Sequence, residues 1–205
     1  MAELLAALSY GERLARTRAR DNIRFAPDQR RQKQQQAVAR REAENAALIE
    51  ARLIELGGKE LEASFAPHFD AFFSHTTPTD WLEAQAWHYI GDALVRDFAD
   101  ALLPALDPVS AEVVRRALAE RDEQESFALD EVTAMVSGDP GSADRVAAFA
   151  RRIIGEGLTQ TRRALDGSVG VGELLGGEEG EKRALLALLQ SHRERLDRLG
   201  VELVD

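Results

Sequence analysis

The segment TPTDWLEAQAWHYIGDALVRDFADALLP, residues 77–104, decides the fold class of this chain. It opens with turn residues, and Thr79 is a good helix N-cap just before Trp81. Apolar residues then recur at helical spacing until Pro104, which cannot continue a helix. The segment therefore predicts one long helix.

The same pattern continues on both sides of this segment. Charged residues make up 30% of the 205 residues, and alanine, leucine, arginine and glutamate dominate, which is typical of long helices. We expect helices over about 2–22, 28–56, 61–73, 81–103, 108–135, 143–165 and 181–199. The glycines between 166 and 180 predict a mobile loop, because their spacing does not match a phosphate-binding loop. The chain is expected to be all-α.

The order of these helices favours one architecture. Four long helices, with a longer crossover between the second and the third, are typical of ferritin-like antiparallel four-helix bundles. The length suits a single domain, residues 1–205, with a core bundle over about 2–136. The helices at about 143–165 and 181–199 would then be additional C-terminal helices, and we expect the last to pack on the outside of the bundle or on a second subunit.

Charge and composition exclude several function classes. The chain has no cysteine, which excludes disulfides and thiolate metal sites. It shows no signal-peptide pattern and no apolar run near the roughly 18 residues that span a bilayer, so we expect a cytoplasmic protein with no membrane partner. A net charge of −10 disfavours nucleic acid, although a basic stripe over 30–41 keeps tRNA open as a partner.

Polar side chains interrupt the apolar stripes at matching places. Glu12 lies one turn from Leu8, Glu42 lies among small apolar residues, and Asp92 follows His88 by one turn. In the helix over 108–135, Arg121 is in phase with Val114, Leu118, Ala128 and Val132, and Gln124 shares its side. These side chains are expected to meet inside the bundle.

Several motifs resemble one branch of the ferritin-like superfamily, and nearly the whole chain is covered. They are LSYGE (8–12), RLIELG (52–57), TPTDWLE (77–83), YIGD (89–92), RRIIGEGLTQ (151–160) and HRERLDRLG (192–200). The chain resembles the MiaE-like branch, and within it the actinobacterial ferritin-like fold proteins grouped with tRNA hydroxylases. The resemblance implies a helical bundle that holds a di-iron site.

The implied iron ligands are only partly present. Each of four helices would supply a carboxylate, and two of them would add a histidine in a Glu-x-x-His pair. Glu12, Glu42 and Asp92 match this pattern, whereas Asn45 replaces the first histidine and Arg121 and Gln124 replace the second pair. An amide is a poor ligand for iron, and a protonated guanidinium has no lone pair to offer.

Two functional hypotheses follow from this altered pattern. In the first, Arg121 neutralises the three carboxylates, and the protein is a metal-free, non-catalytic scaffold that associates with itself or with a protein partner. In the second, Glu12, Glu42 and Asp92, with or without His88, hold a single metal ion or a weakly bound pair, and the protein is a MiaE-like hydroxylase or other oxidoreductase acting on a modified tRNA nucleoside. The first hypothesis implies no cofactor, and the second implies iron.

Overall fold

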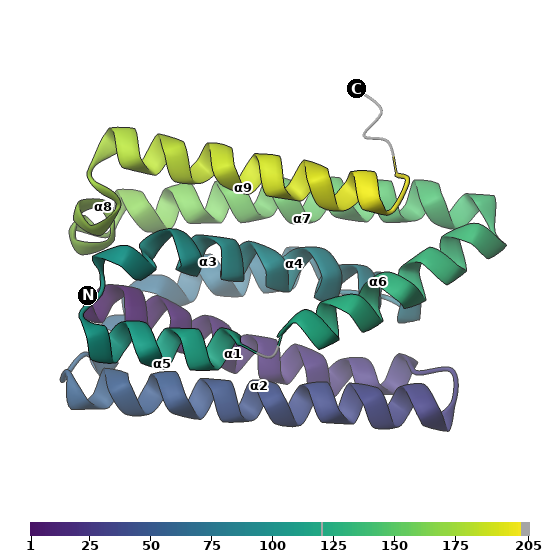
Figure 1. Cartoon of the computed structure of the whole chain (residues 1–205), viewed down its shortest axis with the longest axis horizontal. Helices are drawn as coiled ribbons and strands as arrows, with labels where there is room; N and C mark the ends of the chain where they lie inside the picture. Colours follow the sequence, from purple (N-terminus) through teal and green to yellow (C-terminus); the bar gives the residue numbers. More distant parts are fainter. Residues whose placement is uncertain (120, 202–205) are drawn as a thin grey trace.

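The computed structural model describes residues 1–119 and 121–201; the side chains of Arg121, Asp122, Pro140 and Val169 lie outside this description. All regular structure in the described ranges is helical (Figure 1). The all-α prediction is therefore confirmed.

The α-helices follow one another along the chain with short connections. They are α1 (Ala2–Asn22), α2 (Gln29–Glu55), α3 (Glu62–His75), α4 (Trp81–Leu102), α5 (Pro108–Leu118), α6 (Arg121–Gly138), α7 (Pro140–Asp166), α8 (Val169–Leu175) and α9 (Glu178–Arg198). Aspartate side chains cap α2, α4, α5 and α7 by accepting bonds from backbone N–H groups of the first turn. At α4 the cap is Asp80, not Thr79 as predicted, because Asp80 accepts from the Glu83 N–H.

The long helices lie roughly along one direction (Figure 1). α1 and α2 form an antiparallel hairpin on one side, and α7 and α9 lie on the other. α4 lies between them and contacts α6, α7 and α9, whereas α3 contacts α1 and α7 along its length. The predicted crossover thus contains a helix, α3, that packs against α1 and α7.

The prediction of one helix over 108–135 is wrong. This segment forms two helices: α5 packs on α2, and α6 packs on α4 and α7 in a different direction (Figure 1). One straight helix could not reach both surfaces. The helical spacing that was predicted to put Val114 and Arg121 on one face therefore does not apply across the break. Within α6 the predicted inward face is confirmed, since Gln124, Ala128 and Val132 are buried.

The predicted loop over 166–180 is also wrong, because its centre forms α8. Ser168 caps this helix by accepting a bond from the Val171 N–H. Glu3 of α1 also accepts bonds from the Ser168 hydroxyl and, at 3.0 Å, from the Gly170 N–H. Gly176 and Gly177 then end the helix with φ of 90° and 74°, a conformation that glycine adopts without strain. Capping and a long-range contact outweigh the low helix propensity of glycine.

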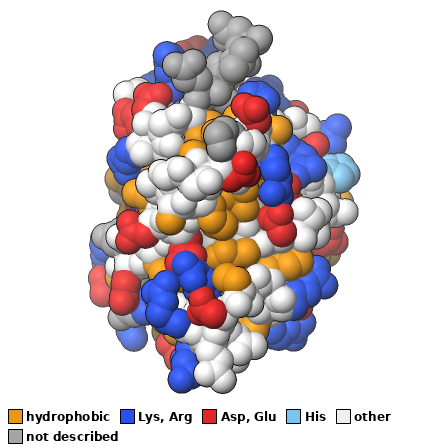
Figure 2. Space-filling view, turned by 90° about the vertical axis from the view of Figure 1, so that its right-hand side faces the viewer, with side chains coloured by type: hydrophobic (Ala, Val, Ile, Leu, Met, Phe, Trp, Pro, Cys, Tyr) orange, Lys and Arg blue, Asp and Glu red, His pale blue; other side chains and the backbone are white. Residues whose placement is uncertain are grey.

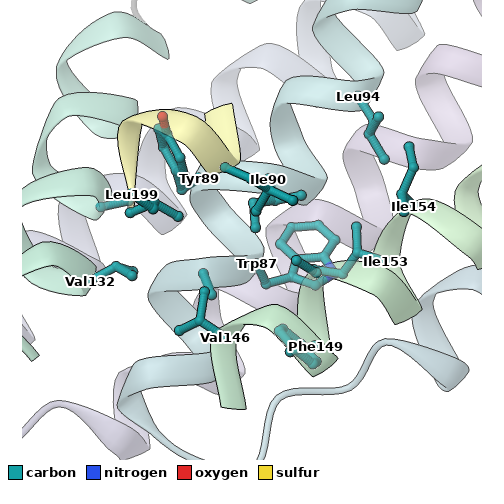
Figure 3. Packing of buried hydrophobic residues seen from close by; sticks show 14 of the residues in the cluster. Trp87, Tyr89, Ile90, Leu94, Val132, Val146, Phe149, Ile153, Ile154 and Leu199 are labelled. Carbon is teal, nitrogen blue, oxygen red and sulfur yellow. The ribbon is translucent and has the colours of Figure 1, made fainter. Parts of the chain in front are cut away.

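Trp87 of α4 lies in the middle of the larger hydrophobic core, packed near Phe149 and Ile153 of α7 (Figure 3). Its ring is 1% exposed, and its indole N–H donates to the Thr76 hydroxyl at 3.1 Å. α7, predicted as an additional helix, thus supplies central core residues. α9 packs on the outside of α4, as predicted, and buries Leu188 and Leu196 there.

His192 of α9 makes the stability of the fold depend on pH. It is 2% exposed, and burial, with the nearby charge of Arg195, lowers its pKa to about 4. Between pH 6.5 and 4 the unfolded chain binds a proton at this residue and the native chain does not. Stability is therefore complete above pH 6.5, and we expect it to fall by roughly 3 kcal/mol as the pH drops to 4.

The substitution His192→Leu isolates this effect from carboxylates that titrate over the same range. Urea unfolding of both proteins at pH 7 and pH 4.5 gives the comparison. The variant should lose less stability than the parent over this interval. Equal losses in both proteins would show that His192 does not contribute.

Candidate functional site

A cluster of buried polar side chains lies where α2, α4 and α6 meet. α4 contributes His88 and Asp92, one turn apart, so both side chains project from the same face. α2 contributes Gln35 and α6 contributes Gln124. The exposed fractions are 0% for Gln35, 3% for His88 and Gln124, and 5% for Asp92. We call these four residues the interior polar cluster.

Hydrogen bonds run through this cluster in one direction. The Gln85 side-chain N–H donates to Gln35 Oε1 at 3.2 Å, so Gln35 presents its Nε2 as a donor, and one N–H of this group donates to the Ala19 carbonyl oxygen at 3.1 Å. Gln35 Nε2 lies 2.9 Å from His88 Nε2 and donates to it. His88 Nδ1 therefore carries the ring proton and donates to Asp92 Oδ2 at 2.9 Å. Both ring nitrogens of His88 are thus used inside the protein.

Asp92 is the acceptor at the end of this chain of bonds. Besides His88 it binds Gln124, whose Nε2 donates to Asp92 Oδ2 at 3.0 Å. A cavity of about 10 Å³ beside these residues, also lined by Arg96 and Glu125, has room for about one water molecule. In its bond to Asp92, Gln124 presents its N–H group. To bind a metal ion at this place, the Gln124 side chain would have to present its oxygen instead.

Arg18 supplies a buried positive charge near Asp92. Its guanidinium donates to the carbonyl oxygens of Phe73 and Thr76, and it lies 5.2 Å from the ring centres of both Phe73 and Trp87. Burial lowers the pKa of Arg18 to about 10, and the negative charge of Asp92 opposes this decrease. Arg18 therefore stays charged at neutral pH and provides electrostatic compensation to Asp92.

The other predicted site residues lie on α1, α2 and α6. Glu12 and Glu42 are each 1% exposed, and Asn45 is 7% exposed, so all three lie inside the protein as their spacing predicts. Arg121 is the first residue of α6, but its side chain lies outside the described part of the chain. The prediction that Arg121 neutralises the carboxylates stays a prediction.

The described residues do not fit a di-iron centre. Among them, no three His, Asp or Glu side chains are grouped closely enough to hold a metal ion. The lone pair of His88 Nε2 accepts a hydrogen bond from Gln35, and amides stand at Asn45 and Gln124. Oxygen-activating iron sites rely on imidazole and carboxylate ligands.

Sequence reasoning missed Gln35, Gln85, Arg18 and Asn22 in this region. Gln35 lies in the same stripe of α2 as Val38, Glu42 and Ala46, so the periodicity that pointed to Glu42 also indicated Gln35. Arg18 and Asn22 lie near the C-terminal end of α1 and belong to no recognisable sequence motif. Only their contacts with the segments of α3 and α4 show that they are buried.

The fold and its interior define a ferritin-like helical bundle. Residues 1–178 match the model of the family described as the ferritin-like domain of actinomycetes, and the chain belongs to this family. No curated protein matches the chain. The family match supports the ferritin-like superfamily, and the narrower MiaE-like branch stays a prediction.

The predicted basic stripe of α2 is partly neutralised by acidic side chains of α6. Arg30 and Arg31 both pair with Glu131, and Arg41 pairs with Glu123 at 3.4 Å. The view of the bundle end where α1 turns into α2 shows basic and acidic side chains intermixed around hydrophobic ones (Figure 2). None of the helices in the described ranges combines the length and apolar composition that a bilayer crossing requires.

Proposed function

We propose that this chain is a metal-free, non-catalytic ferritin-like bundle that acts as a scaffold or interaction protein. The observation that carries the proposal is the double engagement of His88, which accepts from Gln35 and donates to Asp92. In a catalytic metal site a histidine keeps one ring nitrogen for the metal. Here an internal hydrogen-bond network takes the place of metal coordination.

Breaking this network for a metal would be costly. An ion bound through His88 and Asp92 would displace the bonds from Gln35 and Gln124, whose amide groups are buried. Each buried polar group left without a partner costs about 1–3 kcal/mol. The metal would have to offset both losses before it bound with useful affinity.

An interaction role requires a surface for a partner, and α9 offers one. Its inner face packs on the bundle, while Leu186 and Leu189 are 65% and 41% exposed. Exposed leucines one turn apart form an apolar strip that a second copy or another protein can cover. Self-association through this strip is the form of the proposal that we favour.

The alternative is a MiaE-like hydroxylase that acts on a tRNA nucleoside. This function requires a basic surface for the RNA and a metal site. The donor groups of the described residues do not favour such a metal site. The ion pairs of Arg30, Arg31 and Arg41 with α6 weaken that surface, and the net charge of −10 opposes RNA approach.

Thermal unfolding in the presence of Co²⁺, a spectroscopically visible substitute for iron, tests the metal-free proposal. A bound ion stabilises the native state by about 2.7 kcal/mol at a concentration 100 times its Kd. We expect no change in Tm between chelator-treated protein and protein with excess Co²⁺, and no visible absorption band. A rise in Tm that disappears in His88→Gln would contradict the proposal, because His88 would then be a ligand.

A further inference from the structure

An apolar cavity of about 110 Å³ lies between α1, α3, α4 and α7. Leu8, Phe65 and Leu94 belong to its lining and are buried, and no member of the interior polar cluster lines it. An engineered apolar cavity of about 150 Å³ takes up benzene. This cavity is therefore large enough to hold part of a hydrophobic ligand, and it is separate from the interior polar cluster.

The cavity follows the long axis of the bundle. α7 lines it from Ile154 to Leu165, which corresponds to about 16 Å at 1.5 Å per residue. Gly157 lines the cavity between these two residues, and a Cβ there would lie 3.1 Å from Leu94 Cδ1. The space is thus long and narrow, which suits an extended hydrocarbon chain better than a fused ring system.

The polar part of the cavity lining lies on α3 and α7. Phe69, Leu158 and Ala164 of these two helices are only partly buried, as are Ala7 of α1 and Val95 and Phe98 of α4. The polar side chains of the lining, His68, Gln160 and Thr161, come from the same two helices. They can form hydrogen bonds to a small polar group on this side of the cavity, while the rest of the lining is apolar.

We propose that this cavity binds a single linear hydrocarbon chain with a small polar head, as found in a fatty acid or its glycerol monoester. The chain lies along α7 against the leucine and phenylalanine wall. The head lies beside the polar side chains of His68 and Thr161. Burial of the chain supplies the affinity, at about 0.8 kcal/mol for each buried CH₂ group.

Titration of delipidated protein with decanoate, followed by isothermal calorimetry, tests this proposal. We expect saturable binding of one decanoate per chain. The substitution Ala164→Phe fills the cavity and should weaken binding at least tenfold. Ala148→Phe, the same change at an exposed position of α7, should leave it unchanged. Equal affinity in all three proteins, or no saturable binding to the parent, would overturn the proposal.

Three further comparisons refine the test. Thr161→Leu narrows the cavity from a partly exposed position, so it still reports on the cavity if Ala164→Phe does not fold, and it too should weaken decanoate binding. The glycerol monoester of decanoate separates the two sources: tighter binding of decanoate assigns the free acid, and tighter binding of the monoester assigns the ester. Tighter binding of 2-naphthoate than of either would overturn the linear-chain assignment.

Discussion

The substitution Asp97→Ala is expected to lower the free energy of unfolding by about 3 kcal/mol, because it removes the bidentate partner of a buried arginine and leaves only the ion pair with Glu125 at 3.9 Å. Arg195 of α9 is 6% exposed and binds both carboxylate oxygens of Asp97 on α4, at 2.6 and 2.8 Å. Burial acts to lower the pKa of Arg195, but Asp97 and the charge of Glu125 raise it above its ordinary value. The guanidinium therefore stays charged and must be compensated.

Urea unfolding at pH 7 measures this effect. Asp100→Ala is the matched control, since Asp100 lies one turn further along α4 and is exposed. We expect a change within about 0.5 kcal/mol for this control. A loss below 1 kcal/mol for Asp97→Ala would show that the ion pair does not hold α9 on the bundle.

Restoring the missing ligands is expected to create a metal site. The triple substitution Asn45→His, Arg121→Glu and Gln124→His completes the pattern that the family resemblance implies around Glu12, Glu42 and Asp92. At position 124 the new imidazole would replace an amide that already lies 3.0 Å from Asp92. We expect uptake of about two iron ions per chain, the number that ferritin-like di-iron bundles hold.

Gln124→His alone is the control, because it adds one imidazole and keeps Arg121. It should bind no iron that survives desalting. Circular dichroism establishes that both variants keep their helices. A folded triple variant that takes up no iron would contradict the idea that this interior derives from a metal site.

The helices were predictable where local signals and periodicity agreed. The apolar stripe from Trp81 onward indicated α4, and the predicted start at 108 agrees with α5, which Asp107 caps. The break between α5 and α6 was not predictable from the stripe, because Val114 and Ala128 each fit a helix and the change of direction depends on α2 and α4. α8 was missed because its sequence is rich in glycine and its start is also held by Glu3, far away in sequence.

The buried positions of the interior polar residues could be predicted from the sequence, but their hydrogen bonds could not. Periodicity placed Glu12, Glu42 and Asp92 on inward faces, and all three are buried. The direction of the hydrogen bonds through Gln85, Gln35 and His88 depends on contacts between α2 and α4 that no motif encodes. Sequence could therefore propose His88 as a ligand, and only the structure shows what occupies its two nitrogens.

The iron content of the native chain tests the central claim most directly. Protein purified without a metal-binding tag is analysed for iron before and after anaerobic incubation with ferrous iron, followed by desalting. The metal-free account predicts far less than one iron per chain in both samples. Near-stoichiometric iron that resists desalting would contradict it, and would mean that the altered ligand set still builds a metal centre.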